Sequence, residues 1–80
     1  MQGIIELNVH NKNKYQTRIA VDALLKRTDN SVYRIRIIHG YNRGTELKDM
    51  LTEEYSHHPR ILRLQHYQNK GQTDLILREI

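Results

Sequence analysis

The alternation of apolar and polar residues predicts two strands in the first half of the chain. After Ile4, residues 4–10 place every second side chain on one apolar face, made by Ile5, Leu7 and Val9. Residues 32–39 are rich in β-branched side chains, which alternate with Arg34 and Arg36. A period of two residues is typical of a strand that buries one face.

Helical spacing predicts two helices that separate these strands from the rest of the chain. Residues 14–28 contain no Gly or Pro and follow Asn13, which we expect to be the N-cap. One side of this helix carries Thr17, Ala20, Ala23 and Leu24. Residues 45–56 place Leu47, Met50, Leu51 and Tyr55 at helical spacing, with acidic residues near the start that suit the helix dipole. Pro59 follows and ends this element.

The last third of the chain predicts two further strands joined by a short turn. Residues 61–67 point Leu62 and Leu64 inward, and residues 73–79 do the same with Leu75 and Leu77. The order βαβαββ with right-handed crossovers places both helices on one face of a four-stranded mixed sheet. We therefore expect one α/β domain over residues 1–80, built as a two-layer sandwich.

Such a sandwich leaves one sheet face without helices. The residues out of phase with the apolar face are expected there: Glu6, Asn8, His10, Arg34, Arg36, Arg63, Gln65 and Arg78. They would form a basic, hydrogen-bonding surface. The alternative is an ordinary solvated sheet face without a functional role.

Composition narrows the classes of function. The chain has 80 residues, a formal net charge of +4 and a pI near 9.6, so polyanions are the first partners to consider. The absence of Cys excludes disulfides and thiolate zinc sites. The apolar runs are too short to span a membrane, and the first residues lack the pattern of a signal peptide. We expect a cytoplasmic protein that acts as a monomer, without a membrane partner.

A histidine and two glycines mark the junction between residues 32–39 and the second helix. His39 ends the strand, where α/β folds place ligand sites, and Gly40 permits a tight turn. Gly44 lets backbone approach a ligand, Arg43 suits phosphate oxygens, and the helix start is a ready anion site. A purely structural loop would have the same sequence.

His10 ends the first strand, and Asn8 lies on the same face two residues earlier. Neighbouring parallel strands bring their carboxyl ends to one edge, so His10 and His39 are candidates for general acid and base. The alternative is two unrelated histidines at strand ends. The adjacent residues His57 and His58 are expected in a solvated turn, and His66 is expected to be half-buried with its hydrogen bonds satisfied.

Three segments, "LNVHN", "IIHGYNRGT" and "NKGQTDLIL", resemble the small MutS-related (Smr) domain, over almost the whole chain. The resemblance implies the fold of the C-terminal domain of translation initiation factor 3, nucleic-acid binding and endonuclease activity on DNA or messenger RNA. The family's Leu-Asp-Leu-His falls on Leu7, Asn8, Val9 and His10, and its His-Gly-x-Gly on His39, Gly40 and Asn42, with a later glycine at Gly44. Asn8 replaces an acid, and Asn11 and Asn42 replace glycines.

The leading hypothesis is therefore a stand-alone Smr-like domain that binds nucleic acid and cleaves a phosphodiester. Its catalytic residues would be His10, His39 and Asn8, and its nucleic-acid-binding residues would be Lys12, Lys14, Arg34, Arg36, Gly40, Asn42, Arg43 and Gly44. We predict no metal-ligating residues; cleavage of RNA would need no metal, whereas cleavage of DNA would favour a divalent cation. The alternatives are a nucleic-acid-binding module without catalysis and a domain that contacts protein, including the ribosome.

Overall fold

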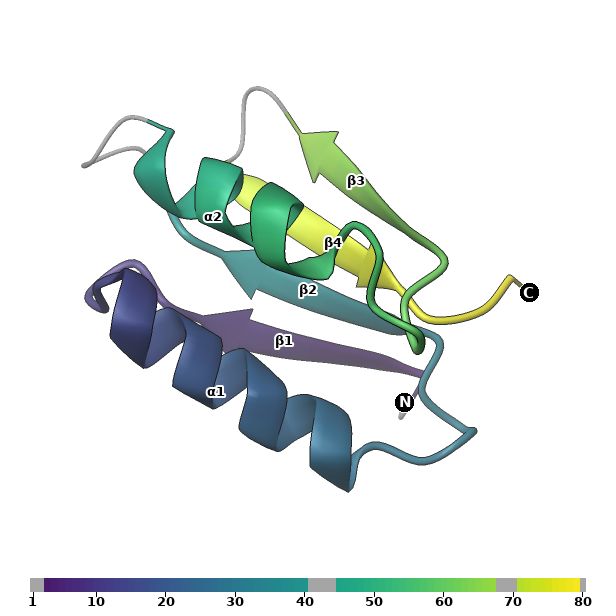
Figure 1. The fold of residues 1–80 in the computed structure, drawn as a ribbon. Helices are drawn as coiled ribbons and strands as arrows, with labels where there is room; N and C mark the ends of the chain where they lie inside the picture. The colour runs from purple at the N-terminus through teal and green to yellow at the C-terminus, as the bar shows by residue number, and fades with distance from the viewer. Residues whose placement is uncertain (1–2, 41–44, 68–70, 80) are drawn as a thin grey trace.

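Six elements follow one another in the predicted order βαβαββ. The structure is a computed structural model, and it describes residues 3–40, 45–67 and 71–79. The elements are β1 (Ile4–Asn8), α1 (Lys14–Arg27), β2 (Arg34–Ile38), α2 (Glu46–Tyr55), β3 (Arg63–Tyr67) and β4 (Gln72–Ile76) (Figure 1).

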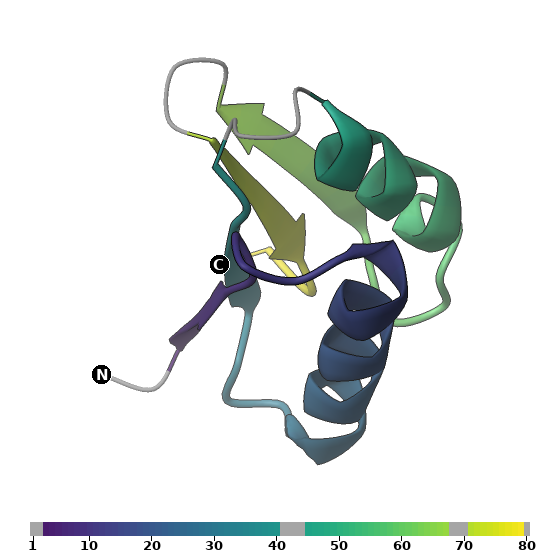
Figure 2. The same ribbon diagram turned by 90° about the vertical axis from the view of Figure 1, so that its left-hand side faces the viewer.

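The four strands form one mixed sheet in the order β1-β2-β4-β3. β1 and β2 run parallel, whereas β4 is antiparallel to both β2 and β3. Both helices cover the same face of the sheet, which leaves the other face open (Figure 2). The predicted two-layer sandwich is therefore confirmed.

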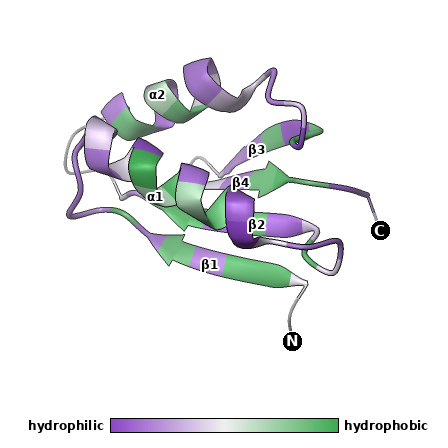
Figure 3. Cartoon of the chain, turned by 60° about the horizontal axis from the view of Figure 1, so that its bottom comes forward, coloured by the Kyte–Doolittle hydropathy of each residue, from purple (hydrophilic) through white to green (hydrophobic). Residues whose placement is uncertain are grey.

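The core lies between the sheet and the helices. Ile35, Ile37 and Leu75 from the two central strands are fully buried, together with Val9 just beyond β1. Figure 3 shows hydrophobic segments in β1, β2 and β4, whereas the last turn of α1 and the segment after it are hydrophilic. Burial of this apolar face is the main favourable contribution to folding, at roughly 25 cal/mol for each Å² removed from water.

The helix α1 begins as predicted but turns a different side to the core. The Asn13 side chain accepts a hydrogen bond from the Gln16 backbone N–H at 2.8 Å, and the Gln16 side chain accepts one from the Asn13 N–H at 3.0 Å. This capping box satisfies two donors that the first turn leaves free. Ala23 is exposed, so its predicted place in the core is wrong. The buried residues are Thr17, Val21, Leu24 and Leu25, one step further around the helix.

The helix α2 buries the four predicted residues, but the strand that follows starts later than expected. Leu62 is 57% exposed, so its predicted inward position is wrong, and the adjacent Ile61 fills the core at 5% exposure. β3 begins only at Arg63, so its alternation cannot be extended back to Leu62. Its core-facing positions are Leu64 and His66. No helix in the described ranges is long and apolar enough to cross a membrane.

Candidate functional site

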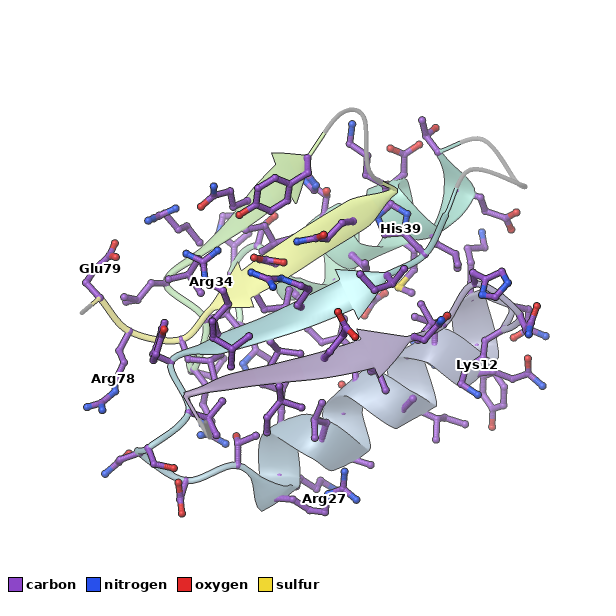
Figure 4. All side chains as sticks on the ribbon, turned by 180° about the vertical axis from the view of Figure 1, so that it is seen from behind. Lys12, Arg27, Arg34, His39, Arg78 and Glu79 are labelled. Atoms are coloured by element: carbon purple, nitrogen blue, oxygen red, sulfur yellow. The ribbon has the colours of Figure 1, made fainter. Side chains whose placement is uncertain are left out.

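The two sequence motifs meet at the edge where β1 and β2 end. The strands are parallel and in register, with Asn8 opposite Ile38, and the Val9 N–H donates to the Ile38 carbonyl at 2.9 Å. A Cβ placed on Gly40 would lie 3.5 Å from the Cβ of His10, so the residues after the two strands are in contact. Figure 4 shows His39 and Lys12 at this same end of the sheet. The prediction that both strand ends share an edge is confirmed, and we call the surface formed by Asn8, His10 and Gly40 the lip.

Asn8 fixes the tautomer of the exposed His10 ring. The Asn8 Oδ1 atom accepts from the backbone N–H of His10 at 3.1 Å and lies 2.9 Å from its Nδ1. A backbone N–H can only donate, so the amide atom at this position is the oxygen, and Nδ1 must also donate to it. The neutral ring therefore carries its proton on Nδ1 and its lone pair on Nε2. No residue in the described part of the chain hydrogen-bonds to that Nε2.

His39, by contrast, lies inside the fold. It is 7% exposed and shares the core-facing phase of Ile35 and Ile37. Its Nδ1 donates to the Gly40 carbonyl at 3.0 Å, and its Nε2 lies 2.9 Å from the Thr73 hydroxyl. Both ring nitrogens are thus engaged within the protein. Of the two predicted catalytic histidines, only His10 presents a nitrogen to solvent.

A second glycine, which the sequence analysis did not single out as part of the site, holds the lip in place. Gly40 and Gly71 have φ angles of +69° and +55°, a region that residues with a side chain rarely adopt. The Gly71 carbonyl accepts from the N–H groups of His39 and Gly40 at 2.8 and 2.9 Å. A Cβ on Gly71 would lie 2.6 Å from the Gly40 Cα, so only glycine allows this approach. The signal in the sequence was the turn "NKGQ", which places a glycine directly before the last strand.

The predicted phosphate-binding arginines Arg34 and Arg36 lie on the helix-free face, but they surround a buried carboxylate. Asp74 is fully buried, and its Oδ2 accepts from Arg34 Nη1 at 2.6 Å. The Arg36 Nε lies 3.6 Å from the other Asp74 oxygen, and the Tyr67 hydroxyl donates to Asp74 at 3.3 Å. The bond to Asp74 raises the pKa of Arg34, which therefore stays cationic. Arg34 also lies at the opposite end of β2 from His39 (Figure 4), so the structure does not bring it to the lip.

The other predicted residues of the helix-free face include acids, so this face carries mixed charge. Glu6 is exposed there opposite Arg36, and Arg63 pairs with Glu79 at 3.3 Å. The expected basic surface is therefore offset by three carboxylates, those of Glu6, Asp74 and Glu79. Sequence reasoning had placed the arginines on this face but had missed Asp74, although its phase in the last strand puts it there too.

Two of the predicted cations, Lys12 and Lys14, follow His10 of the lip closely in sequence. Lys14 is the exposed first residue of α1, and Lys12 is half-buried in the preceding turn. Asn42, Arg43 and Gly44 lie outside the described residues. At the start of α2, the acids Glu46 and Asp49 occupy the first turn and already complement the positive end of the helix dipole.

Two of the remaining histidines, His66 and His57, match their predicted places, whereas His58 was expected in a solvated turn and is half-buried. His66 is half-buried, with Nδ1 3.0 Å from the Thr73 hydroxyl and Nε2 3.2 Å from that of Thr52. His57 is exposed in the turn after α2, and His58 Nδ1 accepts from the Arg60 N–H at 3.1 Å. Over the described ranges, no group of three or more His, Asp or Glu side chains is arranged to hold a metal ion.

Comparison of the chain with models of protein families, with curated proteins and with solved structures finds no match. The likeness to the Smr domain therefore rests on the motif residues themselves.

Proposed function

We propose that the chain is a Smr-like domain that binds nucleic acid at the lip and cleaves a phosphodiester there, with His10 as the proton acceptor. The observation that supports this most directly is the state of the His10 ring. Its Nδ1 is occupied by Asn8, so the lone pair on Nε2 is left for a ligand in an exposed residue whose Cβ lies beside Gly40. A neutral imidazole with a free lone pair is the side chain best suited to take a proton near pH 7.

RNA is the substrate that fits this site most simply, because its own 2′-hydroxyl can act as the nucleophile. His10 Nε2 removes the proton of a 2′-hydroxyl, the 2′-oxygen attacks the adjacent phosphorus, and the 5′-oxygen leaves with a proton from solvent. Asn8 keeps the ring oriented throughout, as the aspartate of a catalytic triad does for its histidine. An amide stabilises the resulting imidazolium less than a carboxylate would, so we expect slow cleavage.

Binding would rely on the residues that border His10. The ammonium groups of Lys12 and Lys14 would contact phosphates, joined by the guanidinium of Arg43, three residues after Gly40 in sequence. Gly40 has no side chain, so its backbone lets a phosphate come close to His10. His39 then has a positioning role, since both its ring nitrogens hold the turn that carries Gly40. On DNA, which lacks the 2′-hydroxyl, a water molecule would have to be activated, and a divalent cation would serve that step.

A second candidate function is nucleic-acid binding without cleavage, including binding to RNA of the ribosome. The observation that favours it is the amide of Asn8, which can neither accept a proton nor hold a cation as a carboxylate does. The two functions share the lip and its lysines, and they differ only in whether a bond is broken.

Cleavage of labelled single-stranded RNA and nicking of supercoiled plasmid, each with and without chelator, test the proposal. We compare the wild type with His10→Ala and Asn8→Asp, and we use His57→Ala as the matched control because His57 is an exposed histidine outside the lip. The expected result is RNA cleavage that survives chelator, is lost in His10→Ala, persists in His57→Ala and increases in Asn8→Asp.

Each other result changes the conclusion. Plasmid nicking that requires a divalent cation would move the proposal to DNA. Salt-sensitive binding without cleavage would leave the binding module. Neither binding nor cleavage, or cleavage that persists unchanged in His10→Ala, would overturn the proposed role of the lip.

A further inference from the structure

Beneath α2, four side chains form a continuous row of hydrogen bonds from the core to the surface. The His39 Nε2 atom lies 2.9 Å from the Thr73 hydroxyl, and His66 Nδ1 lies 3.0 Å from the same oxygen. On its other side, His66 Nε2 lies 3.2 Å from the Thr52 hydroxyl. His39 and Thr73 are buried, His66 is half-buried and Thr52 is exposed. The row therefore links a buried imidazole to solvent on the helix side of the sheet.

The first contact of the row sets the direction of the others. The Gly40 carbonyl can only accept, so His39 Nδ1 carries a proton and its neutral ring has a lone pair on Nε2. The Thr73 hydroxyl must then donate to His39. Its oxygen is left to accept from His66, whose neutral ring in turn carries its proton on Nδ1. The Nε2 lone pair of His66 then accepts from the Thr52 hydroxyl, which turns away from the Lys48 carbonyl. With both rings neutral, each is thus the Nδ1–H tautomer.

One added proton fits this row at either end. On His66, it would sit on Nε2 and donate to Thr52, whose own hydroxyl donates to the Lys48 carbonyl at 3.0 Å. On His39, it would sit on Nε2, and the Thr73 hydroxyl would turn to donate to His66. Every hydrogen bond is made in both arrangements, so the proton can pass between the rings through Thr73.

Two added protons do not fit. Both rings would then donate to the Thr73 oxygen, and its hydroxyl proton would lack an acceptor. Two cations would also meet at one oxygen, with nitrogens 2.9 and 3.0 Å from it, in a partly buried site. The charged groups around His66 are Lys48 and Asp49 on α2 and, once protonated, His39 just after β2. Burial holds the pKa of His66 below its ordinary value, Lys48 and His39 act in the same direction, and Asp49 acts against them.

We propose that His39, Thr73 and His66 form a proton relay that accepts a single proton and exchanges it between the buried ring and the surface beside α2. The relay lies on the helix side of the sheet, whereas Asn8 is on the open face. His39 can thus exchange its proton with solvent even when the lip is covered. This inference does not depend on nuclease activity, because it concerns the protonation of the free protein.

Long-range ¹H–¹⁵N spectra of the imidazole rings, recorded between pH 5 and 8.5, test the relay. At alkaline pH, both His39 and His66 should show the Nδ1–H tautomer, which is the less common one for a free imidazole. In Thr73→Val, the hydroxyl is lost, and His66 should change to the Nε2–H tautomer that donates to Thr52. Thr17→Val is the matched control, since it removes a hydroxyl from another fully buried threonine and should leave both tautomers unchanged.

A second pair of variants keeps the test decisive if Thr73→Val does not fold. Thr73→Ser retains the hydroxyl and should retain both tautomers. In His39→Gln, the titration midpoint of His66 should rise, because the neighbouring positive charge is gone. A His66 ring that is Nε2–H in the wild type, or whose midpoint does not respond to His39→Gln, would overturn the relay.

Discussion

The buried carboxylate of Asp74 is the feature whose removal should cost the most stability. The variant Asp74→Asn keeps the shape of the side chain, so it creates no cavity. One of its two oxygens becomes an NH₂ group, however. Oδ2 accepts from Arg34 at 2.6 Å and Tyr67 at 3.3 Å, and Oδ1 accepts from Gln72 at 3.0 Å. Whichever oxygen is replaced, a donor then faces a donor.

The size of the effect follows from burial. Asp74 is fully buried and the Arg34 side chain is only 21% exposed, so water cannot replace the lost partner. Breaking a buried ion pair from one side costs about 3–5 kcal/mol. A chain of 80 residues has a total stability of about 4–12 kcal/mol. The variant should therefore lose a large part of its stability, with a melting temperature lower by about 18–30 °C.

Urea unfolding followed by circular dichroism measures this loss. The control is Glu79→Gln, which removes the carboxylate that pairs with Arg63 at 3.3 Å. Both side chains of this ion pair are about half exposed, so the substitution should not change the unfolding midpoint measurably. A loss below about 1 kcal/mol in Asp74→Asn, or equal losses in the two variants, would refute the view that burial makes Asp74 costly to neutralise.

Three further changes test other parts of the fold. Thr17 is fully buried, and its hydroxyl has no hydrogen-bond partner among the described residues, so Thr17→Val should gain about 1 kcal/mol in urea unfolding; a loss would contradict this reading. Gly71→Ala should lower the melting temperature more than Gly40→Ala, because the added Cβ lies 2.6 Å from backbone in the first case and 3.5 Å from a side-chain atom in the second. Equal losses would count against the close approach of the two turns. The free energy of unfolding should also fall as the pH drops from 7.5 to 5. The pKa of His66 is 6.5 in the unfolded chain and lower in the folded protein, so the unfolded chain binds the proton more readily. His66→Gln should lose less stability over the same range. If the dependence of the free energy of unfolding on pH is unchanged by this substitution, a group other than His66 takes up the proton.

The order of elements and the helix-covered face could be predicted because they follow from the period of the apolar residues. The wrong predictions concern which residue is buried at the edge of an element, where a shift of one position along the chain changes the answer. In α1, the predicted side included the small residue Ala23, which is exposed, and left out Val21, which is fully buried. Leu62 fits the alternation of β3, but the strand starts one residue later and Ile61 fills the core instead.

Of the candidate site, only the meeting of the two neighbouring strand ends could be predicted from the sequence. His10 and Gly40 meet because parallel strands in register end together, and this needs only the topology. The roles of His39 and Arg34 depended on partners from β4, namely Thr73 and Asp74, about 35–40 positions away in sequence. A local pattern contains no information on such a partner. The sequence around His39 and Arg34 is therefore the same whether their side chains face a ligand or bind partners within the fold.

The place of β4 in the sheet has a consequence for how the chain folds during synthesis. Residues 72–76 follow all the other elements in sequence, yet they fill the position between β2 and β3. A growing chain thus carries β1, β2 and both helices before the central partner strand has been made, and the unpaired edge of β2 stays open to other strands. The pairing of β2 with β4 also closes a loop of more than thirty residues, which slows folding relative to local contacts. We therefore expect cooperative structure to form only once β4 has left the ribosome, and incomplete chains to be especially prone to aggregation.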